Sequence, residues 1–179
     1  IDGVDDFFLL HPKIRKVFIQ DIDILDKKKV GRIDVYVANS GSMNGDAGIK
    51  TDNGYMTKML FAKSLIFKMQ KMELINNIYS FQHSVKLVKG TQTGVLSINA
   101  GGGTFTNAVI DSIIKNNVNA LVSTDAEDNC SLYTEKAFFI GVKGAVFNRY
   151  NKDYIKNDQV VIFDGQKISK VDFDGFVMD

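Results

Sequence analysis

Short apolar segments alternate with longer segments of helical periodicity along most of the chain, and this alternation limits the possible folds more than any other feature. The clearest helical pattern covers residues 55–72, where apolar side chains recur at helical spacing with lysines between them. Apolar strands are predicted on both sides of it, at residues 33–37 and 74–81. Alternation of this kind is typical of an α/β protein. We expect three layers, with a mostly parallel central sheet, one antiparallel edge strand and helices on both faces.

The remaining elements are predicted from shorter patterns. Residues 84–88 are expected to pair with 74–81 as the antiparallel edge strand, and residues 39–54 form a long loop rich in glycine and small polar residues. A helix is expected to follow the glycines at 101–103. Further strands are predicted at residues 16–20, 21–25, 119–124, 136–142 and 160–163, with a weaker helix at 145–156 and a hairpin from 160–163 to 168–171. No repeat or proline-rich linker divides the chain, so one domain is expected over residues 1–179.

Composition narrows the class of protein. The chain has 179 residues, of which 45% are hydrophobic and 24% charged, and this is enough to bury a full core. Its 22 basic and 21 acidic side chains leave a net charge of +1, so no overall field recruits nucleic acid or an anionic membrane. No run approaches the roughly 18 apolar residues of a membrane helix. Cys130 is the only cysteine, which excludes an internal disulfide and favours a reducing, cytoplasmic compartment.

Small polar residues fall where predicted strands end and where a helix begins. Ser40 and Ser42 follow the first core strand, Thr104 begins a helix after the glycine loop, and Asp125 ends a later strand. In an open parallel sheet, the C-terminal ends of the strands meet at the crevice where ligands bind. Hydroxyl and carboxylate oxygens, without histidine or thiolate, suit Mg²⁺ or Mn²⁺. The sequence therefore predicts a site for a hard divalent cation.

Three motifs occur in this order along the chain: Ala-Asn-Ser-Gly-Ser-Met at residues 38–43, Gly-Gly-Thr at 102–104 and Thr-Asp at 124–125. Together they resemble the von Willebrand factor A (VWA) domain with its metal-ion-dependent adhesion site (MIDAS). That family carries Asp-x-Ser-x-Ser after its first core strand, a threonine in a glycine-rich loop and an aspartate at a later strand end. The resemblance covers roughly residues 30–165, and the three motifs together are far more specific than any one of them. It implies a Rossmann-like core with N- and C-terminal extensions.

The resemblance also implies roles for individual residues. Ser40 and Ser42 would ligate the metal directly, Thr104 would engage when the site is occupied, and Asp125 would act directly or through water. Ala38 stands where the family has its first acid, so one of two anionic groups and an orienting anchor are missing. We therefore expect metal binding by this chain to be weak or absent. The residues leave open whether Ala38 is natural or a disabling substitution, although the survival of the other oxygens favours substitution.

The function implied by the resemblance is protein recognition or adhesion without catalysis, in which a partner's carboxylate fills the open metal position. Settings of the family include cell-surface adhesion, intracellular assembly with AAA+ ATPases, chelatase subunits and Ro-type RNA-binding proteins, and an AAA+ ATPase is our preferred partner. Three alternatives stay open. One is a metal-dependent phosphoryl-handling enzyme, for which no Lys or Arg clamp is evident in these loops. The others are a component of an RNA–protein complex of the Ro type and a structural domain with a vestigial site.

Each motif has a simpler interpretation as well. Serine and glycine after a strand are ordinary turn formers, Thr104 could cap its helix, and Asp125 could cap the segment that follows. The glycine loop lacks the Gly-Lys-Ser/Thr ending of a P-loop. His11 and His83 have no acid or nucleophile at a diagnostic spacing, so surface or turn roles are expected for them.

Overall fold

The computed structural model describes residues 32–51, 54–125, 130–142, 160–163, 168–171 and 177–178. Eight strands form one sheet in the order β10-β9-β8-β7-β6-β1-β4-β5. The five central strands run parallel. They are β4 (Ile75–Phe81), β1 (Ile33–Ala38), β6 (Ala120–Ser123), β7 (Ala137–Val142) and β8 (Val160–Phe163). Antiparallel strands complete both edges: β5 (Val85–Val88) beside β4, and β9 (Ile168–Val171) with β10 (Val177–Met178) beside β8.

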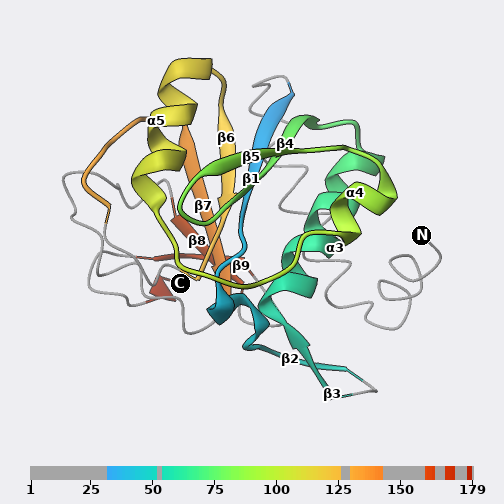
Figure 1. Cartoon of the computed structure of the whole chain (residues 1–179). Helices are drawn as coiled ribbons and strands as arrows, with labels where there is room; N and C mark the ends of the chain where they lie inside the picture. The colour runs from blue at the N-terminus through green and yellow to red at the C-terminus, as the bar shows by residue number, and fades with distance from the viewer. Residues whose placement is uncertain are drawn as a thin grey trace.

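Helices lie on two sides of this sheet (Figure 1). α3 (Lys58–Lys71) connects β1 to β4, while the short α4 (Gln92–Leu96) and then α5 (Thr106–Asn116) precede β6. Because β4 and β6 flank β1 on opposite sides, right-handed crossovers place α3 and α5 on opposite faces of the sheet, as Figure 1 shows. The direction of winding therefore reverses at β1.

The core lies between the sheet and these helices. Buried side chains of α3, among them Leu65 and Ile66, belong to the same apolar cluster as Val35 and Val37 of β1. On the other side, buried Tyr36 of β1 reaches α5, where its hydroxyl lies 2.8 Å from Ser112 Oγ. Alternate residues of β1 thus face opposite helices, as the two-residue period of a strand requires. Burial on both faces explains why the strand is a continuous apolar run apart from Asp34.

The predicted α/β class and mostly parallel sheet are confirmed, but the prediction of one antiparallel edge strand is wrong, because β9 and β10 extend the opposite edge. The predicted loop at 39–54 is also wrong. It contains the 3-10 turn η1 (Gly41–Asn44) and the strand β2 (Asp46–Thr51), which pairs with β3 (Gly54–Thr57) in a separate hairpin. Gly48 and Gly54, both at positive φ, interrupt the side-chain alternation that would reveal these strands.

The principal helix begins later than its periodicity predicts. Residues 55–57 belong to β3, and the helix begins at Lys58 because the hydroxyl of Thr57 accepts a hydrogen bond from Leu60 N at 3.1 Å. The predicted strands at 16–20 and 21–25 and the predicted helix at 145–156 lie outside the described residues. Within the described ranges, none of the helices is long and apolar enough to span a membrane.

Candidate functional site

The loops that follow β1 and β6 leave the same end of the sheet from neighbouring strands. β1 and β6 pair in parallel, and their last paired residues are Val37 and Ser123. Neighbouring strands lie about 4.8 Å apart, so the segments after these two residues start side by side. Since β4 flanks β1 on its other side, this is where the strand order reverses, and ligands of open α/β sheets bind at that point.

Both predicted serines lie in a tight turn directly after β1. Ser40 immediately precedes η1, Ser42 lies within it, and their hydroxyl oxygens are 2.9 Å apart. Main-chain hydrogen bonds close the turn: Met43 N donates to Ser40 O at 3.1 Å, and Gly45 N donates to Ser42 O at 2.9 Å. The buried side chain of Met43 fixes the turn in the core. The structure therefore brings the two hydroxyls together and holds them by backbone bonds.

The glycine loop before α5 is bonded to this serine turn. Gly41 N donates to Gly102 O at 3.1 Å, and Gly101 N donates to Asn39 O at 2.7 Å. Glycine is required at position 102, because φ is +85° there and a Cβ would lie 2.9 Å from Gln82 Oε1. Two predicted motifs, far apart in sequence, thus form one connected pair of loops.

Thr104, the third predicted site residue, follows the glycine loop. It lies two residues beyond Gly102 and is half-buried. Within the described ranges, its side chain makes no hydrogen bond with Ser40, Ser42 or Asp125. The helix cap proposed for it is also absent, since α5 begins at Thr106 and its N-cap residue is Phe105. Thr104 is therefore near the serine turn through its loop, without a bond to it.

Asp125 is buried in an unusual way. Its side chain is 0% exposed, and among the described residues neither carboxylate oxygen has a hydrogen-bond partner. Buried carboxylates are normally ion-paired and hydrogen-bonded, because removing the charge from water is costly. The ion pair that Asp125 makes with a described residue is to Lys58, whose Nζ lies 3.5 Å from Asp125 Oδ2. That distance is longer than the usual length of about 2.7 to 2.9 Å for a charge-assisted hydrogen bond. The ion pair therefore leaves the hydrogen-bonding capacity of both oxygens unused.

Lys58 links the serine turn to Asp125. It is the first residue of α3, and its backbone N donates to Gly45 O at 2.9 Å, so the helix starts against the end of the turn. A Cβ on Gly45 would lie 3.8 Å from Lys58 Cε, which shows that the lysine stem passes directly over this glycine. Its side chain is 16% exposed. Sequence reasoning missed this lysine, because the predicted start at residue 55 placed it inside a helix with a solvated lysine face.

Ala38 and Asn39 complete the surroundings. Ala38, at the end of β1 and beside Phe81 of β4, is fully buried. The Oδ1 atom of Asn39 is buried and, like the Asp125 oxygens, has no hydrogen-bond partner within the described ranges. Three unsatisfied oxygen atoms therefore belong to the ends of two neighbouring strands. Buried oxygens without a partner can ligate a hard cation or accept hydrogen bonds from ordered water.

The other chemically conspicuous residues have ordinary surroundings. His83 is exposed in the turn between β4 and β5 and lies against Gly103, where a Cβ would be 2.9 Å from His83 Cε1. The buried Cys130 donates from Sγ to Leu132 O at 3.2 Å. His11 lies outside the described residues.

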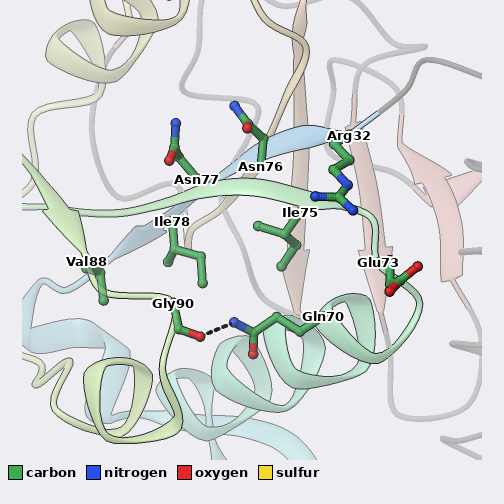
Figure 2. Close-up of a pocket in the computed structure, with 9 residues that line it drawn as sticks. All are labelled: Arg32, Gln70, Glu73, Ile75, Asn76, Asn77, Ile78, Val88 and Gly90. Atoms are coloured by element: carbon green, nitrogen blue, oxygen red, sulfur yellow. Dashed lines mark hydrogen bonds between the residues drawn. The ribbon is translucent and has the colours of Figure 1, made fainter.

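A cavity of about 380 Å³ opens at the other end of the sheet (Figure 2). Its polar lining comes from Arg32 before β1, from Gln70 and Glu73 at the end of α3, and from Asn76 and Asn77 of β4. The side chain of Gln70 is already engaged, since its Nε2 donates to Gly90 O at 2.8 Å. The cavity contains none of the predicted metal ligands.

Comparison with known proteins adds no relative: no family model matches the chain, and no curated protein matches its sequence. In the part of the chain that the structure describes, no group of three or more histidine, cysteine, aspartate or glutamate side chains could hold a metal ion. The function is therefore inferred from the chemistry of the strand ends.

Proposed function

We propose that this chain is a protein-recognition domain of the VWA type, with a cation site at Ser40, Ser42, Thr104 and Asp125 that is weakened by Ala38. The observation that carries the proposal is the state of Asp125, a fully buried carboxylate to which no described residue donates a hydrogen bond. A structural carboxylate would be satisfied by its neighbours. One left unsatisfied after β6, the strand next to β1 that precedes the two paired hydroxyls, supports a role in holding a ligand.

The available ligand atoms are all oxygens, the type that a hard cation prefers. Asp125 offers a carboxylate, Ser40 and Ser42 offer hydroxyls 2.9 Å apart, and Asn39 offers an unsatisfied amide oxygen. Mg²⁺ takes six oxygen ligands and usually keeps several waters. A bound Mg²⁺ would supply the positive charge to which an acidic side chain of a partner protein binds. An AAA+ ATPase as that partner stays a prediction.

Restoring an acid at position 38 tests the site. Ala38→Asp is expected to raise Mg²⁺ affinity by about ten- to a hundredfold, the usual effect of a supporting group at a metal site. Isothermal titration calorimetry with Mg²⁺ measures it. Ala38 is fully buried, so any larger residue also disturbs packing, and Ala38→Asn is the matched control because it adds the same volume without the charge.

Two results would contradict the proposal. If Ala38→Asp and Ala38→Asn bind Mg²⁺ equally weakly, position 38 is not part of a cation site. If Ala38→Asp binds Mg²⁺ but Asp125→Asn in the same background binds it as well, the carboxylate that carries the proposal has no part in the binding.

A phosphoryl-handling enzyme is the second candidate, and Lys58 is the observation that favours it. A lysine near a metal-binding carboxylate can hold a transferring phosphoryl group. No such clamp is evident in the sequence, and the lysine ammonium 3.5 Å from Asp125 supports this candidate. Hydrolysis of a phosphoester by the Ala38→Asp protein with Mg²⁺, abolished by Lys58→Met, would replace the recognition proposal with this one.

A further inference from the structure

We propose that the ammonium group of Lys58 is the resident cation of this site, neutralising Asp125 and keeping divalent metal ions from binding to it. The inference rests on the proposed function, and it identifies what balances the charge of the site when no metal is bound. Three independent features of the described residues support it.

The first feature is the electrostatic state of Asp125. An ionised carboxylate that is fully buried is strongly unfavourable unless a positive charge lies near it. Within the described residues, the ion pair to Lys58 at 3.5 Å is the compensation that Asp125 has, and no hydrogen bond assists it. The ammonium group therefore supplies the positive charge that a bound metal ion would otherwise supply.

The second feature is the position of Lys58 in its helix. Lys58 is the first residue of α3, and no acidic residue lies in the first turn. The N-terminus of a helix carries a partial positive charge, so a lysine there is unfavourable unless something else attracts it. The stem runs over Gly45 toward Asp125 instead of extending from the helix end into water. Attraction to the Asp125 carboxylate therefore accounts for the direction of the Lys58 side chain.

The third feature is the charge balance created by Ala38. With alanine at the end of β1, Asp125 is the one carboxylate among the proposed ligands, and a single ammonium balances it. A divalent ion added to this pair would leave an excess of two positive charges beside the core. Two like charges a few ångströms apart repel strongly where solvent is excluded. Lys58 and a metal ion are therefore competitors for the same carboxylate.

The test uses Lys58→Met, which keeps the length of the side chain and removes its charge. In the presence of a chelator, this variant is expected to melt on the order of 5 °C below the parent, because Asp125 loses its counter-charge. Adding Mg²⁺ or Mn²⁺ is expected to recover most of that loss, and to have no such effect on the parent. Differential scanning calorimetry with and without the metal measures both effects.

Affinity gives a second readout. In the Ala38→Asp background, adding Lys58→Met is expected to tighten Mg²⁺ binding by at least about tenfold, because the competing charge is gone. Lys58→Arg retains the charge and should behave like the parent. Lys68→Met, in the last turn of the same helix, is the matched control and should change neither the metal response nor the affinity.

The outcomes separate the two proposals. If Ala38→Asp binds Mg²⁺ with the same affinity with and without Lys58→Met, Lys58 is not a competing cation, while the cation site itself stands. If neither of these proteins binds Mg²⁺ or Mn²⁺, the cation site is wrong. If Lys58→Met in chelator is as stable as the parent, Lys58 does not neutralise Asp125, whatever the metal does.

Discussion

Two carboxylates among the described residues are buried, Asp34 and Asp125, and their surroundings differ sharply. Asp34, near the start of β1, is 2% exposed, and its Oδ1 accepts hydrogen bonds from Asn76 Nδ2 at 3.0 Å and from Asn77 N at 3.1 Å. Asp125, after the end of β6, is 1% exposed and accepts none. Among the described residues, similar burial thus accompanies two accepted hydrogen bonds at one end of the sheet and only an ion pair at the other.

The sheet register explains why Asp34 accepts a hydrogen bond from the main chain of β4. Ile33 pairs with Ile75, but Val35 pairs with Ile78, so two residues of β4 oppose the single Asp34 of β1. Such a bulge leaves a main-chain N–H without a ladder partner. Asp34 accepts that N–H, which makes it a structural residue whose charge serves the fold. Asp125 accepts no main-chain N–H from a described residue, and for this reason we assign ligand binding to Asp125 and not to Asp34.

The largest expected effect is that of Asp34→Ala, which removes the acceptor at the bulge. We expect a loss of about 2 to 3 kcal/mol in the free energy of unfolding, because hydrogen bonds to a charged group are the stronger ones. Urea denaturation measures this loss. Asp34→Asn keeps an acceptor oxygen in place and is expected to lose less. An unchanged stability for Asp34→Ala would show that the bulge does not need the carboxylate.

Tyr36→Phe is expected to lower the free energy of unfolding by a smaller amount, because it removes the contact of the Tyr36 hydroxyl with α5. Tyr36 stacks on Tyr79 with ring centroids 4.7 Å apart, and its hydroxyl lies 2.8 Å from Ser112 Oγ. Loss of this hydrogen bond is expected to cost about 1 kcal/mol near neutral pH. Val37→Ile, on the opposite face of β1, serves as a packing control without a hydroxyl.

The pH dependence of the same variant follows from the tyrosine pKa values. Burial raises the pKa of Tyr36 above its ordinary value of 10, the hydrogen bond with Ser112 opposes this shift, and the charges of Tyr79 and Asp34 add smaller increases. A pKa raised by folding means that stability is fully present below the unfolded pKa of about 10 and is lost as pH rises through the folded value. Tyr36→Phe should therefore show a shallower alkaline loss in urea denaturation, and an equally steep one would contradict this.

The sequence predicts the sheet better than it predicts the site. Apolar runs locate β1 and β8 within one residue, because burial on both faces leaves little room for polar side chains. The meeting of the serine turn with the glycine loop also follows from the order of the sequence motifs, although that loop lies between α4 and α5 and not at a strand end. The pairing of Lys58 with Asp125 does not. It depends on where α3 begins, and an error of three residues in that start hides a lysine that opposes the helix dipole.

The smallest expected effect is that of Asp125→Asn, although Asp125 is as deeply buried as Asp34. The substitution removes a buried charge that has no hydrogen bond, and the lysine it leaves behind is 16% exposed and can turn toward water. Replacing a poorly satisfied buried ion by a neutral isostere is often neutral or stabilising. We therefore expect the free energy of unfolding to change by less than about 1 kcal/mol. Urea denaturation beside Asp34→Ala measures the contrast directly. A loss as large as that of Asp34→Ala would mean that both carboxylates serve the fold, and Asp125 would then no longer distinguish a ligand site.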